Sequence, residues 1–166
     1  MEEKKIVIRE KSADLTEALP DGYEGVINAD LDATVSERSK GIKSEDRRKK
    51  ILIIDDDTIM LKVVKEQLQD KYDVAVAING RIACKYLENR QADMIFLDYE
   101  MPEEKGPEVY EKLRLIKGVD SMPVVFMTGV RDLSKIFGVM SSDPQGCIFK
   151  PIDNGVLTGT IEYFVG

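Results

Sequence analysis

Apolar residues in the second part of the chain fall into short runs that end abruptly in a polar residue. The four clearest pieces are Ile51–Asp57, Met94–Pro102, Val124–Gly129 and Ile148–Pro151. An apolar run of this length, bounded by polar or turn residues, is typical of a buried strand in a parallel sheet. The polar residues that end these runs are Asp55, Asp98, Thr128 and Lys150. Each predicted strand therefore ends in a side chain able to interact with phosphate or a metal ion.

Strands and amphipathic helices alternate along this part of the chain. Strands are predicted over 51–55, 73–78, 93–98, 123–127 and 146–149. Apolar residues recur three and four positions apart after each strand, which is the spacing of one helix face. These residues are Leu61, Val64 and Leu68; Ala83 and Leu87; Val109, Leu113 and Ile116; Leu133, Ile136, Phe137 and Met140; and Leu157, Ile161 and Phe164. The alternation predicts an α/β fold with a doubly wound, five-stranded parallel sheet.

Residues 1–48 do not share this pattern. Ile6–Ile8 is long enough for one short strand and Asp14–Leu19 for one helical turn. So few apolar residues cannot bury a core of their own. We therefore predict a flexible or loosely docked N-terminal extension over 1–48, followed by a folded domain over 49–166. The alternative is an arm that pairs with a sheet edge or with a partner.

Composition limits the classes of partner. A chain of 166 residues with 43% apolar residues has enough material for one domain with an appendage. Its formal charge of -7 makes direct contact with nucleic acid unfavourable. The one prominent basic run, Arg47–Lys50, is interpreted as a solvated lead-in to the first strand. With no histidine, the chain cannot use a histidine base, a histidine metal ligand or a phosphohistidine.

Neither a membrane segment nor a redox motif is visible in the sequence. No apolar stretch approaches the roughly 20 residues that span a bilayer, and Met1–Arg9 has acids where a signal peptide has bases. Cys84 and Cys147 are far apart and form no metal or redox motif, so buried thiols in a reducing compartment are the expectation. A cytoplasmic location without membrane contact is predicted.

The acids that end the first and third strands are the strongest candidate site. The carboxyl ends of parallel strands meet at one edge of the sheet, where ligands of such folds bind. Asp55, Asp56 and Asp98 would then lie close together. Like charges about 4 Å apart repel by roughly 4 kcal/mol at an effective dielectric constant near 20, so such a cluster holds a proton or a cation. All-oxygen ligands favour a hard ion such as Mg2+. Taken alone, the Asp55–Asp57 run could simply be a helix start.

The four pieces, in this order, resemble the receiver domain of two-component response regulators. The resemblance runs from about Lys49 to Gly166 and is strengthened by Asp98-Tyr99-Glu100-Met101-Pro102 and by Gly106. It implies the flavodoxin-like strand order 2-1-3-4-5. It also implies a signalling switch, not a metabolic enzyme. The donor of the phosphoryl group would be a sensor histidine kinase or a histidine phosphotransfer protein. An output domain or a homodimer partner are further possibilities.

The resemblance also implies a role for each site residue. Asp98 would be the phosphoryl acceptor, and Mg2+ would be bound by Asp56 directly and by Asp55 through water. The backbone carbonyl of Glu100 would complete the protein ligands. The Thr128 hydroxyl would donate to a phosphoryl oxygen, with room left by Gly129. Lys150 would neutralise charge, aimed by a cis bond to Pro151.

Two departures from the family pattern concern the phosphorylated form and the response to it. Glu100 and Val130 are positions whose side chains tune the access of water, and hence the lifetime of the phosphorylated form. Cys147 replaces the aromatic residue that usually stands three positions before the lysine. The switch is therefore predicted to work without ring rotation, through movement of the segment from Thr128 to Met140 that contains Phe137.

Two other interpretations remain open at this stage. Haloacid-dehalogenase-like phosphatases also place Asp-x-Asp after an apolar strand, which would make Asp55 a nucleophile supported by Asp57, Thr128 and Lys150. The Met101-Pro102 pair after Asp98, and the lack of a later acidic pair, argue against this class. A degenerate receiver that serves only as an interaction module is the other alternative.

Overall fold

The computed structural model describes residues 47–129 and 144–166. The predicted helix with Leu133–Met140 and most of the predicted N-terminal extension lie outside these ranges, so the division at residue 48 stays a prediction. The elements within them are β1 Lys50–Ile54, α2 Thr58–Leu68, β2 Asp73–Ala77, α3 Gly80–Asn89, β3 Met94–Asp98, α4 Gly106–Arg114, β4 Val124–Thr128, β5 Gly146–Phe149 and α6 Asn154–Val165. Among the helices of these ranges, none has the length and apolar character that crossing a bilayer requires.

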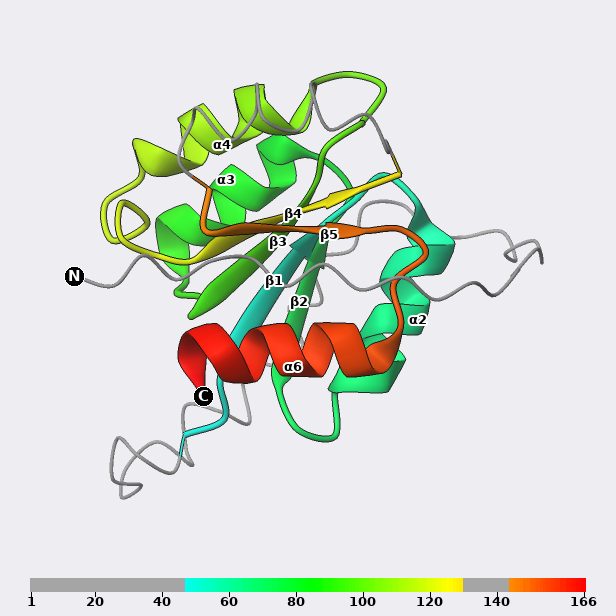
Figure 1. Ribbon diagram of the computed structural model, residues 1–166. Coiled ribbons are helices and arrows are strands. Elements are labelled where there is room, and N and C mark those ends of the chain that lie inside the picture. Colours follow the sequence, from blue (N-terminus) through cyan, green and yellow to red (C-terminus); the bar gives the residue numbers. More distant parts are fainter. Residues whose placement is uncertain (1–46, 130–143) are drawn as a thin grey trace.

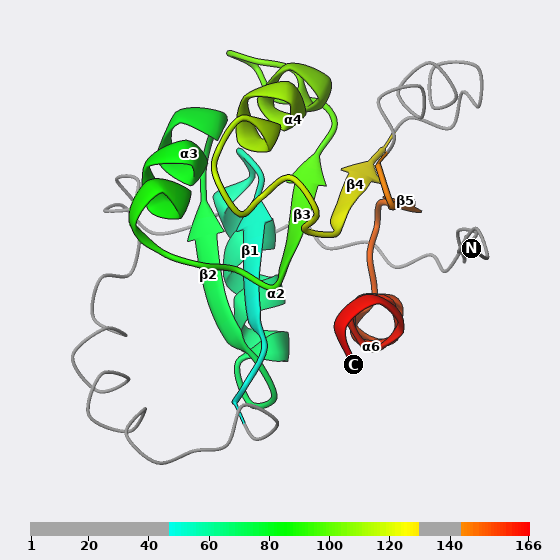
Figure 2. The same ribbon diagram turned by 90° about the vertical axis from the view of Figure 1, so that its left-hand side faces the viewer.

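The five strands form one parallel sheet in the order β2-β1-β3-β4-β5. This confirms the predicted α/β class and strand order. The order reverses at β1, because the chain leaves β1 for β2 on one side and returns to β3 on the other. The carboxyl ends of β1 and β3 therefore flank the switch point at which such sheets bind ligands. In Figure 2 the strand arrowheads gather at this edge of the sheet.

Helices cover both faces of the sheet. Helices α3 and α4 lie on one face, and α2 and α6 lie on the other (Figure 1). Successive strand side chains point to opposite faces. In β1, Leu52 and Ile54 pack with the α3 and α4 layer, whereas Ile51 and Ile53 pack with the α2 and α6 layer. Both faces are buried, which explains why the strands appear in the sequence as continuous apolar runs.

Short polar residues begin helices α2, α3 and α6. The Asp57 carboxylate accepts hydrogen bonds from the backbone N–H groups of Ile59 and Met60 at the start of α2. Asn79 caps α3 and Asp153 caps α6 in the same way. These contacts satisfy donors that the first helical turn leaves without partners. The interpretation of Asp57 as a helix start is confirmed.

Arg114 connects several segments at the edge of the sheet where the strands begin. Its guanidinium donates to the carbonyls of Val119 and Met122 and to the side chain of Gln145. The same guanidinium carbon lies 4.6 Å from the centre of the Tyr110 ring. Gln145 in turn accepts from the backbone N–H of Val124. The end of α4, the following loop and the start of β4 are thereby joined.

Gly106 allows α4 to begin close to the acidic edge of the sheet. A Cβ atom built there would lie 2.5 Å from the backbone oxygen of Asp98 and 2.8 Å from the Cα of Tyr99. Backbone atoms cannot yield as the end of a flexible side chain can. The start of α4 can therefore approach β3 this closely only without a side chain at position 106.

We predict that Gly106→Ala destabilises the protein by about 1 to 3 kcal/mol, the usual cost of overpacking. Gly159→Ala is the matched control, because a Cβ at this exposed position in α6 meets no atom of the part of the chain that the structure describes within 4 Å. That change should stabilise by about 0.5 to 1 kcal/mol through helix propensity. Urea denaturation of the two variants measures both effects. Equal stabilities for the two would contradict the proposed close approach.

Candidate functional site

Four side chains from four strand ends meet at the carboxyl edge of the sheet. Asp55 directly follows β1, Asp98 and Thr128 are the last residues of β3 and β4, and Lys150 directly follows β5. Asp55, Asp98 and Thr128 are buried. Their positions follow from the apolar runs in the sequence. Each run forms a parallel strand through the core, and the residue at its carboxyl end lies at the same edge of the sheet. The predicted convergence is therefore present.

Three carboxylates form a compact cluster at this edge. Each of Asp55, Asp56 and Asp98 offers one oxygen, and these oxygens lie within 4.8 Å of one another. Asp56 is exposed, so the cluster opens to solvent on one side. A set of carboxylate oxygens that is partly accessible to water suits a hard, partly hydrated divalent cation. The donor set thus fits the ion that the sequence suggested.

Lys150 bridges the two buried acids. Its Nζ lies 2.6 Å from Oδ2 of Asp55 and 3.0 Å from Oδ1 of Asp98. Its backbone N–H donates to the carbonyl of Thr128 at 2.8 Å, which fixes the start of the side chain beside β4. The peptide bond between Lys150 and Pro151 is cis, as the resemblance implied. One ammonium group thereby offsets part of the charge of the two carboxylates.

The two buried acids do not ionise as readily as free carboxyl groups do. Burial, followed by the neighbouring charge of Asp55, raises the pKa of Asp98 from 3.8 to about 6, although Lys150 opposes the shift. Burial also raises the pKa of Asp55. Burial alone would lower the pKa of Lys150, but the two carboxylates outweigh it and raise that pKa. The cluster is therefore short of positive charge.

Backbone donors hold the acids in place. The N–H of Asp57 donates to Oδ1 of Asp55 at 2.8 Å. A backbone hydrogen bond from Glu100 acts on Asp98 and favours its charged form. The side chain of Glu100 is exposed. Glu100 therefore contacts the site through its backbone N–H, and the role of its carbonyl as a metal ligand stays a prediction.

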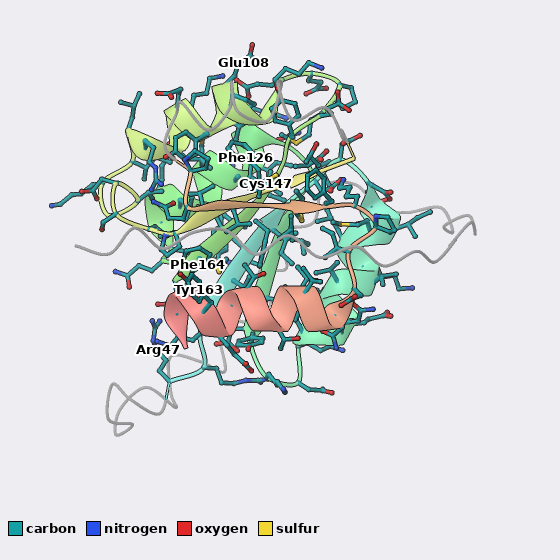
Figure 3. All side chains as sticks on the ribbon, viewed as in Figure 1. Arg47, Glu108, Phe126, Cys147, Tyr163 and Phe164 are labelled. Carbon is teal, nitrogen blue, oxygen red and sulfur yellow. The ribbon has the colours of Figure 1, made fainter. Side chains whose placement is uncertain are left out.

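The residues assigned to the switch are only partly described. Thr128 is buried, and a Cβ built at Gly129 would meet no atom of residues 47–129 and 144–166 within 4 Å. Cys147 is buried and pairs in register with Phe126 of β4 (Figure 3). Burial raises the pKa of its thiol to about 11. Phe137 lies outside the described residues, so its role stays a prediction.

Two features of the site were not foreseen. The double contact of Lys150 with Asp55 and Asp98 requires a geometry that spacing alone does not give. An aromatic group also lies beside β3, because Tyr99 and Tyr110 both contact the Phe126 ring, at 6.2 and 5.8 Å between ring centres. The signal for the second feature was present, since Tyr99 adjoins Asp98 in the sequence. Its partner could not be identified before the register of β3 against β4 was known.

The fold and the site define a class of protein. They describe a doubly wound parallel α/β domain with a carboxylate cluster and a lysine at the topological switch point. Comparison with known proteins narrows this class. A family model described as the response regulator receiver domain matches residues 51–162. The chain belongs to this family.

Individual relatives give the same picture. A protein-glutamate methylesterase/protein-glutamine glutaminase of Paramagnetospirillum magneticum is 33% identical over 118 residues, which are 69% of this chain and 32% of that protein. A chemotaxis protein CheY homolog of Campylobacter jejuni is 28% identical, over 70% of this chain and 92% of its own length. The structure of Vibrio cholerae CheY4 has a TM-score of 0.68 and 25% identity, covering 72% of this chain and all of its own. The chain spans less than two thirds of several curated relatives.

These findings establish the general function. The chain contains a receiver domain, a signalling switch rather than a catalytic enzyme, and its acidic pocket of Asp55, Asp56 and Asp98 is typical of phospho-accepting receivers. Family membership sets aside the haloacid-dehalogenase-like interpretation of Asp55. A receiver domain implies a histidine kinase partner.

Proposed function

We propose that Asp98 accepts a phosphoryl group from a phosphohistidine donor, with Mg2+ bound at the acidic cluster. The observation that carries this proposal is the position of Asp98. It is buried at the switch point, lies within reach of Lys150, and shares a cation-binding cluster with Asp55 and Asp56.

Asp98, Lys150 and Thr128 can together carry out the transfer of the phosphoryl group. An oxygen of Asp98 forms a bond to phosphorus, while the phosphorus–nitrogen bond to the donor imidazole breaks and its electron pair stays on the donor nitrogen. The product is an acyl phosphate on Asp98. Lys150, already 3.0 Å from Asp98, stabilises the charge of the transferring group, and Thr128 donates a hydrogen bond to one phosphoryl oxygen. Thr128 is suited to this because it ends β4 at the same edge.

Asp55, Asp56 and the backbone carbonyl of Glu100 would hold Mg2+ together with Asp98. A bound divalent cation supplies positive charge against the phosphoryl oxygens. The raised pKa of Asp98, about 6, supports this arrangement, because a cation beside the carboxylate would stabilise its charged form against burial and against the charge of Asp55. The donor would be a sensor histidine kinase or a histidine phosphotransfer protein in the cytoplasm.

Direct mapping of the modified residue tests the proposal. The protein is incubated with acetyl phosphate and Mg2+, the acyl phosphate is reduced with borohydride, and the labelled peptide is sequenced by mass spectrometry. We expect label on Asp98 only, and only when Mg2+ is present. Label on Asp55 would instead support a phosphatase-like nucleophile. No label on any carboxylate would indicate a degenerate receiver that acts by binding alone.

A further inference from the structure

The edge of the sheet opposite the acidic cluster carries a pocket that phosphorylation does not use. It lies where β1 and β2 begin, between the end of α3 and the loop after α4, and its volume is about 730 Å³. Five-residue strands separate the two edges by roughly 17 Å at the usual rise per residue. The pocket is therefore a separate surface, in the size range of ligand-binding sites.

Apolar side chains form the interior of this pocket, and charged side chains form its rim. Leu87, Ala92, Val119 and Met122 line it and are buried. Three cationic residues, Lys50, Arg90 and Lys117, line it together with two acidic ones, Asp73 and Glu88. Arg90 lies over the Tyr86 ring at 5.5 Å from the ring centre, and Lys117 is exposed. A partner with apolar and acidic groups would complement this surface.

The chain reaches the first strand beside this pocket. Arg47 forms an ion pair of 2.7 Å with Asp93, and the backbone N–H of Lys50 donates to the same carboxylate. Asp93 adjoins Ala92, which lines the pocket. The chain before Arg47 therefore starts next to this surface. Figure 3 labels Arg47 at this point, where the described chain begins.

The sequence before Arg47 has the composition that the pocket requires. Residues 12–37 contain seven Asp and Glu residues and no Lys or Arg. Apolar residues are interspersed among them, including Leu15, Leu19, Tyr23 and Ile27. Only residues 38–46 separate this acidic segment from Arg47. Charge, apolar content and point of attachment thus all favour the same occupant.

We propose that residues 12–37 dock within the same molecule into the pocket formed by the strand starts, the end of α3 and the loop after α4. Acidic side chains of the segment would face Lys50, Arg90 and Lys117, and its apolar side chains would cover Leu87, Val119 and Met122. The docking surface faces away from Asp98, so the interaction leaves the phosphoryl-accepting edge accessible. This gives the loosely docked extension predicted from the sequence a specific location.

A tether makes even a weak contact of this kind significant. Nine residues span at most about 30 Å, and short linkers between two binding groups give effective concentrations in the millimolar range. A contact with a millimolar dissociation constant would thus be about half occupied. Salt should weaken the attraction between the rim cations and the acidic segment, because the screening length is about 10 Å at 0.1 M ionic strength.

Zero-length carbodiimide crosslinking of the full chain tests the proposal, since it joins carboxylates to amines in direct contact. Crosslinks from acids in 12–37 are expected at Lys50 and Lys117, at least fivefold above those at Lys62 or Lys85, which are exposed on α2 and α3. Raising salt to 0.5 M should weaken them severalfold. A mixture of 14N- and 15N-labelled protein shows whether the crosslinked peptides come from one molecule.

Two matched variants complete the experiment. Arg90→Glu/Lys117→Glu should reduce the crosslinks at Lys50 at least threefold, whereas Arg81→Glu/Lys85→Glu, with the same change of charge on the exposed side of α3, should leave them unchanged. Crosslinks spread evenly over all lysines would overturn the proposal, as would crosslinks that are isotopically mixed. The latter would point to a second copy of the chain. The wild-type pattern stands as a test even if a variant fails to fold.

Discussion

Asp98→Asn is expected to abolish labelling by acetyl phosphate and at the same time to stabilise the folded protein at pH 7.5 without Mg2+. Asn has nearly the same shape but lacks the nucleophilic carboxylate and its charge. Asp98 is 3% exposed, and the rise of its pKa from 3.8 to about 6 means that the folded protein resists its ionisation. A shift of this size corresponds to an upper limit of about 3 kcal/mol, so we expect a gain of about 1 to 3 kcal/mol.

The gain in stability of Asp98→Asn over wild type should increase as pH rises. Because the pKa of Asp98 is higher in the folded state, folding takes up a proton between about pH 3.8 and about pH 6. The free energy of unfolding contributed by this group therefore falls as pH rises through that interval. The difference between Asp98→Asn and wild type should be absent below about pH 4 and complete above about pH 6. Urea denaturation at several pH values measures it.

Asp120→Asn is the matched control for Asp98→Asn. Asp120 is exposed and lies in the loop after α4, on the opposite edge of the sheet, so labelling and stability should match wild type at every pH. Label appearing on Asp98→Asn at another residue would remove Asp98 from the role of acceptor. A variant less stable than wild type at pH 7.5 would show that the ion pair with Lys150 outweighs the burial of charge.

Mg2+ is expected to raise the free energy of unfolding of the wild-type protein by about 2.7 kcal/mol at a hundredfold excess over its dissociation constant. The cause is the relief of repulsion among Asp55, Asp56 and Asp98, whose nearest oxygens lie within 4.8 Å. Proton and cation compete for the same carboxylate, so the effect should shrink as pH falls through about 6, the pKa of Asp98. Thermal unfolding in MgCl2, against NaCl of equal ionic strength, measures it.

Variants at two positions distinguish binding of Mg2+ at the acidic cluster from a general effect of salt on stability. Asp56→Asn should lose most of the response to Mg2+, because Asp56 is the exposed member of the cluster. Lys150→Gln should show a larger response than wild type, because the ammonium that now offsets Asp55 and Asp98 is gone. An equal response in all three proteins would mean that the cation does not bind at the acidic cluster.

The sequence was sufficient for the sheet and for most of the candidate site. Continuous apolar runs such as 94–97 belong to strands buried on both faces, and their polar ends had to meet at one edge. Strand bounds were predicted to within one residue. Helix starts such as those after Asp57 and Asn79 are marked by capping residues. The resemblance to receivers supplied the strand order, which local patterns do not encode.

Contacts between residues distant in sequence could not be predicted in this way. Arg114 reaches Gln145 across 31 positions, and Lys150 reaches Asp55 across 95. Such pairs depend on how loops end and where side chains turn, not on spacing. The pocket at the strand starts is of the same kind, because Lys50, Arg90 and Lys117 come from three separate segments. No pattern in the sequence marks them as neighbours.

The order of the strands has a consequence for protein synthesis. Asp55 and Asp98 belong to the central strands β1 and β3, whereas Lys150 adjoins β5, the outer strand that is made last. The ribosome makes the chain from its N-terminus, so a nascent chain carries the acidic pair before it carries the lysine that bridges it. Under the proposed mechanism, a ribosome-bound fragment ending before Lys150 would lack the ammonium that stabilises the transferring phosphoryl group. We therefore expect such an unfinished receiver to accept phosphoryl groups poorly.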